Sequence, residues 1–89
     1  MVQVEFAPAL QRHVAAPLLT IEAGPLRDVL DRALDRVPPM RRYVLDEQGA
    51  VRKHVAVFVN GELQQDRARL ACLLRTGDRI YIVQALSGG

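Results

Sequence analysis

Hydrophobic and polar residues alternate near both ends of the chain. In residues 2–6, valine or phenylalanine occupies every second place with polar residues between them, and residues 79–82 continue this alternation with Ile80 and Ile82. A period of two predicts a β-strand with one buried face. Residues 18–22 repeat the pattern, so we expect them to pair with the first strand as a hairpin, after a turn region around residues 8–13.

After Gly24-Pro25 the period changes to three and four residues. Apolar residues at this spacing share one face of a helix, while charged residues fill the other face. Pro25 suits the first helical position, where no backbone N–H is needed. Pro38-Pro39 should end the helix, because proline disfavours helical geometry in the residue before it. The apolar face is predicted to comprise Leu26, Val29, Leu30, Ala33, Leu34 and Val37.

The middle of the chain predicts another pair of strands. Tyr43-Val44-Leu45 leads into Asp46-Glu47-Gln48-Gly49, a polar set typical of a turn, and a long apolar run follows over residues 51–59. Residues 55–59 are apolar at both parities. That strand is therefore expected to lie inside the sheet rather than at its edge.

Turn signals divide the last third of the chain. Asn60-Gly61 predicts a two-residue turn, because both residues tolerate positive φ. Residues 70–74 form a short apolar segment, and Thr76-Gly77-Asp78 turns the chain into the final strand. One helix after an opening pair of strands, with the other strands following it, predicts an α+β fold in which one main helix packs on a mixed sheet.

Length and charge restrict the class of protein. Eighty-nine residues make one domain. Without a membrane-spanning apolar run or a signal-peptide pattern at the start, we expect a cytoplasmic protein with no membrane partner. The formal net charge of +2 is small for nucleic-acid binding. Arg41-Arg42 and Arg52-Lys53-His54 have no interleaved aromatic residues, so we interpret them as a solvated face; an acidic protein partner stays open.

Reactive side chains are few. Cys72 is the single cysteine, and its apolar neighbours predict a buried thiol rather than a nucleophile. His13 and His54 have no cysteine or histidine at ligand spacing, so no metal site is expected. Asp46-Glu47 is interpreted as a solvated pair in a turn. Acid–base or metal chemistry by the chain itself is therefore not predicted.

The chain ends on Ser87-Gly88-Gly89, and the last two residues carry no side chain to block a narrow channel. Together with the order of elements, the turn at residues 57–62 and Gly77-Asp78 before the last strand, this ending resembles the ubiquitin-like β-grasp sulfur carriers. That group contains the small subunit of molybdopterin synthase and the carrier for thiazole synthesis. The resemblance implies a β-grasp domain over residues 1–84 and a diglycine tail over residues 85–89.

The resemblance also implies a function. In such carriers an ATP-dependent adenylating enzyme joins the terminal carboxylate, here that of Gly89 beside Gly88, to AMP. Sulfur from a persulfide or sulfide donor then displaces AMP and leaves a thiocarboxylate, which an acceptor synthase subunit uses. The chain would be a protein cosubstrate rather than an enzyme, or the small subunit of a sulfurtransferase. It would bind no cofactor itself, since ATP is used by the partner.

A docking surface can be predicted partly from strand parity. If the first and last strands turn their buried faces to the helix, then Tyr81 and Val83 point to the opposite face, and Phe58 joins them. The resemblance places the adenylating enzyme on this face and near the tail. The expected partner-binding residues are Ala7, Phe58, Tyr81, Val83, Leu86 and Ser87.

Two other functions stay open. The same adenylate could pass to a lysine amine, making the chain a protein modifier, although Lys53 is its single lysine. A plain binding module with an accidental diglycine is the second alternative. Within the carrier interpretation, the acceptor could belong to pterin-cofactor, cysteine, thiolated-tRNA or secondary-metabolite synthesis; the extra length over residues 41–53 favours the first two. Gly89 could also become terminal through proteolysis.

Overall fold

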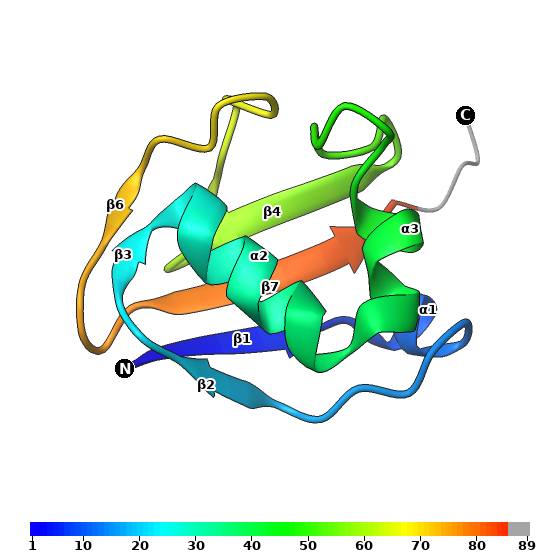
Figure 1. Cartoon of the computed structure of the whole chain (residues 1–89), viewed down its shortest axis with the longest axis horizontal. Helices are drawn as coiled ribbons and strands as arrows, with labels where there is room; N and C mark the ends of the chain where they lie inside the picture. The colour runs from blue at the N-terminus through cyan, green and yellow to red at the C-terminus, as the bar shows by residue number, and fades with distance from the viewer. Residues whose placement is uncertain (86–89) are drawn as a thin grey trace.

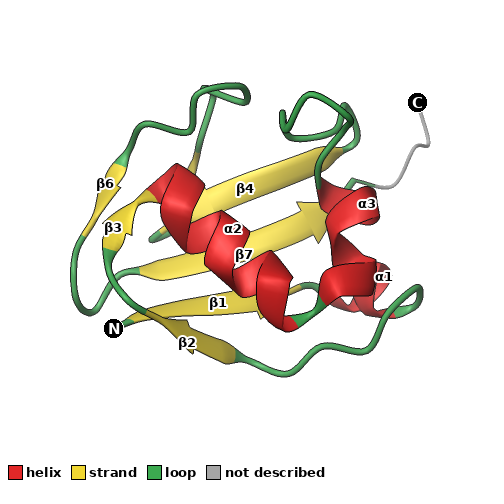
Figure 2. Cartoon of the chain, in the orientation of Figure 1, coloured by secondary structure: helices red, strands yellow, loops and turns green. Residues whose placement is uncertain are grey.

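The structure is a computed structural model and describes residues 1–85. A five-stranded sheet has the order β2-β1-β7-β4-β5, and α2 crosses one of its faces (Figures 1 and 2). β1 and β7 are parallel, and the other neighbours are antiparallel. The predicted α+β fold with a mixed sheet is confirmed. The strands are β1 (Val2–Phe6), β2 (Leu19–Ile21), β4 (Val55–Val59), β5 (Glu62–Leu63) and β7 (Arg79–Gln84).

The strands follow the period-two pattern. In β1 every second residue is buried, and Phe6 is only 1% exposed. β1 and β2 form the expected hairpin, with Val4 opposite Leu19 and Val2 opposite Ile21. Since these four side chains are all buried, the hairpin supplies one side of the core beneath α2.

α2 (Leu26–Arg36) buries five of the six predicted apolar positions and ends before Pro38, and the sixth, Val37, is buried just after the helix. It begins one residue later than expected. Gly24–Pro25 instead forms β3, which pairs with β6 (Leu73–Leu74) in a small second sheet. Within residues 1–85, no helix is long and apolar enough to cross a membrane.

The strand expected at Tyr43-Val44-Leu45 is wrong. The 3₁₀ helix η1 (Pro38–Met40) runs into α3 (Arg41–Val44), and Met40 and Val44 are both buried. Residues four apart share a helix face, which explains why this segment is helical. An isolated bridge joins Leu45 to Val51, and the following strand, β4, begins only at Val55.

A short helix, α1 (Pro8–Gln11), replaces part of the predicted turn region. Pro8 lies at its start, where proline is well tolerated, and Leu10 is fully buried. The Gln11 side chain donates a hydrogen bond to the Phe6 carbonyl at 2.8 Å. α1 therefore closes the end of the core at which β1 ends.

The Asn60-Gly61 turn is confirmed. Asn60 and Gly61 have φ values of 50° and 84°, and the turn joins β4 to β5. The Asn60 side chain accepts a hydrogen bond from the Arg79 N–H at 2.9 Å and donates one to the Asp78 carboxylate at 3.0 Å. The turn thus also fixes the start of β7.

Asp78 holds the turn before β7. Its carboxylate accepts a hydrogen bond from the Arg75 N–H at 2.8 Å as well as the one from Asn60. The Arg75 backbone bond, followed by the Asn60 bond, lowers the pKa of Asp78 below its ordinary 3.8. The ionised carboxylate therefore stabilises the fold above pH 3.8, and the stabilisation is lost as the pH falls through the lower pKa of the folded state.

We expect Asp78→Asn to be less stable than the wild type at pH 7, and the difference to shrink below about pH 4. Urea unfolding at several pH values measures this. Glu22→Gln is the matched control, because the Glu22 side chain is exposed and makes no hydrogen bond within residues 1–85. A stability difference that stays constant down to about pH 2 would contradict the assigned role of the carboxylate.

Candidate functional site

β7 brings the chain to its C-terminal segment. It lies in the middle of the sheet, between β1 and β4. The Ala85 N–H donates a hydrogen bond to the His54 carbonyl at 2.7 Å, so the sheet fixes the last residue that the structure describes. Leu86, Ser87, Gly88 and Gly89 lie outside the described residues. Their proposed roles stay predictions.

The sheet face opposite α2 carries the expected apolar side chains. Phe58 of β4 lies opposite Tyr81 of β7, and Ala56 lies opposite Val83. Tyr81 is 38% exposed, whereas Phe58 and Val83 are partly buried. The parity prediction is therefore confirmed for Phe58, Tyr81 and Val83, although Phe58 is less exposed than a fully open face implies.

Leu63 belongs to the same surface, and the sequence interpretation missed it. It lies opposite Phe58 in the β4–β5 hairpin and is 50% exposed. The signal was present, because a two-residue turn at Asn60-Gly61 sets residues 58 and 63 opposite each other. We name Phe58, Leu63, Tyr81 and Val83 the open-face patch.

Ala7 adds no exposed surface to this patch. It is 3% exposed, and its N–H donates a hydrogen bond to the Ile82 carbonyl at 2.8 Å. The residue lies where β1 ends and α1 begins. The expectation that Ala7 lies on the open face is corrected.

Cys72 is exposed, contrary to the prediction of a buried thiol. Its segment buries Leu70 and Leu74, but Leu73 is 64% exposed. The Cys72 carbonyl accepts a hydrogen bond from the Leu26 N–H at 2.7 Å, which ties the backbone to the start of α2 while the side chain faces outward. Sulfur chemistry at Cys72 must therefore be tested directly.

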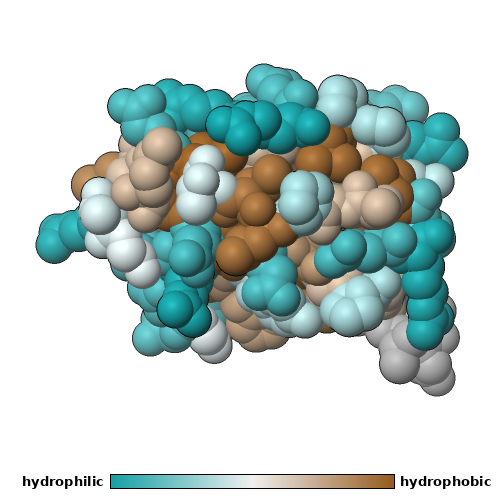
Figure 3. Space-filling model, turned by 90° about the horizontal axis from the view of Figure 1, so that it is seen from below, coloured by the Kyte–Doolittle hydropathy of each residue, from teal (hydrophilic) through white to brown (hydrophobic). Residues whose placement is uncertain are grey.

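Another exposed apolar position lies at the sheet edge formed by β2. Leu18, just before that strand, is 55% exposed. Figure 3 views the molecule from this side and shows hydrophobic side chains in the middle of the surface with hydrophilic ones around them. In the register of β1 and β2, Leu18 falls beside Glu5, the partner of Tyr81, and therefore borders the open-face patch. Leu73, which is 64% exposed on β6 of the second sheet, is therefore the matched control for Leu63.

The open-face patch can bind an apolar surface but offers no acid–base chemistry. Its side chains are a tyrosine and three hydrocarbons. Within residues 1–85, no three histidine, cysteine, aspartate or glutamate side chains lie close enough to hold a metal ion. The arrangement therefore suits the docking of another protein on the open face of β4 and β7.

The model of the ThiS family matches residues 17–89, most of the chain. The chain belongs to the ThiS family. Its members are ubiquitin-like β-grasp sulfur carrier proteins, and the match includes the last residue of the sequence. No curated protein sequence matches the chain.

Solved structures share the fold of this ThiS-family chain. A chain of the BexX/CysO complex of Amycolatopsis orientalis is 20% identical with a TM-score of 0.81, and all of both chains is covered. Small archaeal modifier protein 1 of Methanosarcina acetivorans is 24% identical with a TM-score of 0.79, over 99% of this chain and 95% of that one. CysO of Mycobacterium tuberculosis, an antigen, is 20% identical with a TM-score of 0.79, over 97% and 100%. At these identities the likeness establishes the β-grasp fold.

Proposed function

We propose that the protein carries sulfur as a thiocarboxylate on the C-terminal carboxylate of Gly89. The observation that carries the proposal is the family match that extends through Gly88-Gly89. The position of β7 supports it, because the central strand leads to these residues beside an exposed apolar surface.

The chemistry takes place in an adenylating partner that uses ATP. A carboxylate oxygen of Gly89 attacks the α-phosphorus of ATP and displaces pyrophosphate, which gives a mixed anhydride with AMP. Sulfide then attacks the carbonyl carbon, and AMP leaves with the bonding electron pair. If the donor is a persulfide, the product is an acyl disulfide, which a thiol must reduce to the thiocarboxylate.

The residues of this chain bind and position rather than catalyse. The open-face patch docks on the partner through apolar contacts, of which Leu63 and Tyr81 are the most exposed. The backbone bond from Ala85 to His54 sets the point from which the C-terminal residues reach the partner. We therefore propose a cosubstrate that binds no cofactor of its own and works in the cytoplasm.

The acceptor belongs to an enzyme of biosynthesis. The BexX/CysO complex is an assembly of a protein with this fold and a second protein, which supports an acceptor or activating partner of the same kind here. Molybdopterin and cysteine synthesis are the two pathways that we favour.

Conjugation to other proteins is the second candidate function. It is supported by the similarity in fold to small archaeal modifier protein 1. The same adenylate would then pass to a lysine amine and form an isopeptide. Lys53 is exposed and is the single lysine of the chain, so self-conjugation would be limited to that position.

The deciding experiment is detection of the product after incubation with ATP, sulfide and the adenylating enzyme of the same organism. The carrier function predicts a thiocarboxylate at Gly89. Isopeptide products without any thiocarboxylate would favour the modifier function instead.

A further inference from the structure

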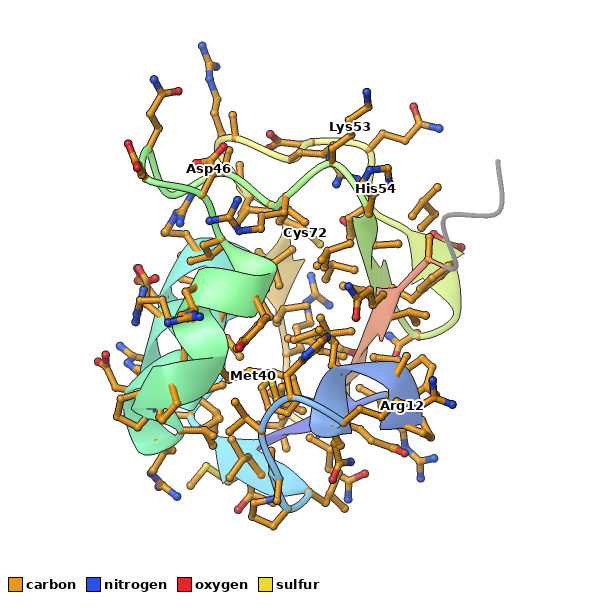
Figure 4. All side chains as sticks on the ribbon, turned by 90° about the vertical axis from the view of Figure 1, so that its right-hand side faces the viewer. Arg12, Met40, Asp46, Lys53, His54 and Cys72 are labelled. Atoms are coloured by element: carbon orange, nitrogen blue, oxygen red, sulfur yellow. The ribbon has the colours of Figure 1, made fainter. Side chains whose placement is uncertain are left out.

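Cationic side chains gather at the end of the molecule toward which β7 runs. A shallow hollow of about 370 Å³ lies there, lined by Arg42, Arg52, Lys53, His54 and Gln84 among others. Figure 4 looks at this end and shows Lys53 and His54 together beside the start of β4. We name Arg42, Arg52 and Lys53 the cationic cluster.

The residues that directly follow Lys53 pair with the end of β7, so the cluster lies beside the base of the C-terminal segment. His54 accepts the backbone hydrogen bond of Ala85, and Val55 lies opposite Gln84 in the sheet. The Gln84 side chain also forms a hydrogen bond with the His13 ring at 3.2 Å. The C-terminal segment therefore starts beside these cations.

The cluster carries positive charge that no carboxylate within residues 1–85 neutralises. Arg41, the neighbour of Arg42, forms salt bridges with Asp31 and Asp35 at 3.1 and 2.9 Å. In contrast, no carboxylate of the described residues lies within 4.0 Å of a cluster side chain. Arg52 donates a hydrogen bond through Nε to the Arg42 carbonyl at 2.6 Å, and its two terminal nitrogens form no salt bridge within residues 1–85.

The nearest acidic residues offset this charge only in part. Asp46 and Glu47 line a neighbouring hollow together with Arg42 and Arg52. One carboxylate oxygen of Asp46 accepts the N–H groups of Gln48 and Ala50 at 2.8 and 3.0 Å, so it serves its own turn. Asp46 and Glu47 together supply two negative charges against the three positive charges of the cluster, which leaves an excess of one positive charge.

The geometry favours an acidic protein surface over a nucleic acid. The aromatic ring at the cluster is Tyr43, and it stacks on His13 with ring centroids 4.4 Å apart. The Arg42 guanidinium lies 5.1 Å from the centre of the same ring. Because His13 and Arg42 both already pack against this ring, it is not a free platform on which a base could stack.

We propose that the cationic cluster binds an acidic segment of the adenylating partner at the mouth of the site that receives the C-terminal residues. The proposal rests on the function proposed above and adds a polar rim to the apolar contact of the open-face patch. Interfaces of this kind have an apolar core and a polar rim, and the rim charges set the association rate and its salt dependence.

The first test is binding to hexaglutamate, followed by amide NMR at an ionic strength of about 0.01 M, where the Debye length is about 30 Å. The variant Arg42→Gln/Lys53→Gln keeps the Arg52 backbone contact. Arg32→Gln/Arg69→Gln removes two exposed arginines elsewhere and lowers the net charge equally. We expect the cluster variant to bind about fivefold more weakly and the control less than about twofold.

The second test uses the adenylating enzyme of the same organism. For the cluster variant, we expect the KM for the carrier to rise about tenfold at low salt with kcat unchanged, and the difference to fade near about 1 M salt. The control variant should keep its KM. A merely structural role would not give this salt-dependent change in KM alone.

Three results would overturn the proposal. Equal losses in the two double variants would mean that only net charge matters. An RNA of about 20 nucleotides that binds more tightly than hexaglutamate through the same residues would assign the cluster to a nucleic acid. If hexaglutamate binding depends on the cluster but the wild-type chain is never adenylated, the proposed function fails and the named partner with it.

Discussion

Deleting Gly89 should reduce adenylation of the protein by at least about 1,000-fold. The deletion moves the terminal carboxylate back by one residue, or about 3.5 Å, whereas a misplacement of about 1 Å can already cost about 100-fold in rate. The adenylating enzyme's ATP–pyrophosphate exchange in the presence of the carrier measures this step without any sulfur donor.

The fold should not change in the same variant. The buried core lies between Val2 and Ile82, so we expect the free energy of unfolding to stay within about 0.5 kcal/mol of the wild type. Ala85→Ser is the matched control, because it alters a side chain at the base of the C-terminal segment without changing the length of the chain or the backbone bond to His54, and it should keep nearly full exchange. Undiminished exchange in the deletion variant would show that the reacting group is not the carboxylate of Gly89.

Tyr81→Asp should weaken binding to the adenylating enzyme by about 30-fold or more, because changes at a central aromatic contact typically cost about 2 kcal/mol. Leu63→Asp should have a similar effect, since it brings a charge into the same apolar contact. Calorimetric titration gives the affinities. Both residues are partly exposed, at 38% and 50%, so unfolding free energies should change by less than about 1 kcal/mol.

Leu73→Asp is the control for this experiment. Leu73 is 64% exposed but belongs to β6 of the second sheet, so its substitution should leave binding unchanged. Wild-type affinity in Tyr81→Asp together with a loss in Leu73→Asp would move the docking site from the open face to that second sheet.

Much of the fold could be predicted because its strands have one buried face. The alternation in β1 and β7 assigned their faces correctly, and Asn60-Gly61 fixed a hairpin whose register depends on the turn alone. The same register placed Phe58 and Tyr81 on the open face. Leu63 could have been found by the same reasoning.

The errors arose where local pattern and tertiary position differ. Pro38-Pro39 follows the end of α2 but also begins η1, which continues into α3. Tyr43 therefore lies in a helix, although a strand was predicted there. Cys72 lies in an apolar run, yet this segment buries only its two ends, Leu70 and Leu74, and exposes the three residues between them. Ala7 was placed by resemblance, which does not reveal that its side chain is buried.

The sequence also could not show which basic residues form salt bridges. Arg41 and Arg42 are adjacent in sequence and look equivalent, but only Arg41 reaches the carboxylates of α2. Asp31 and Asp35 lie on α2, about one helix turn apart, and the sequence does not show which arginine of α3 they reach. Which cations stay available to a partner therefore depends on the tertiary structure.

The most direct test of the carrier function is the mass of the intact protein after incubation with ATP, sulfide and the adenylating enzyme. It should be made on the wild type and on Cys72→Ser, because the exposed thiol could itself take up sulfur. We predict a gain of about 16 Da in both proteins, from one oxygen exchanged for sulfur, whereas a cysteine persulfide would add about 32 Da. Digestion should place the gain in the C-terminal peptide that ends at Gly89. A gain of about 32 Da that disappears in Cys72→Ser and persists without Gly89 would contradict the account.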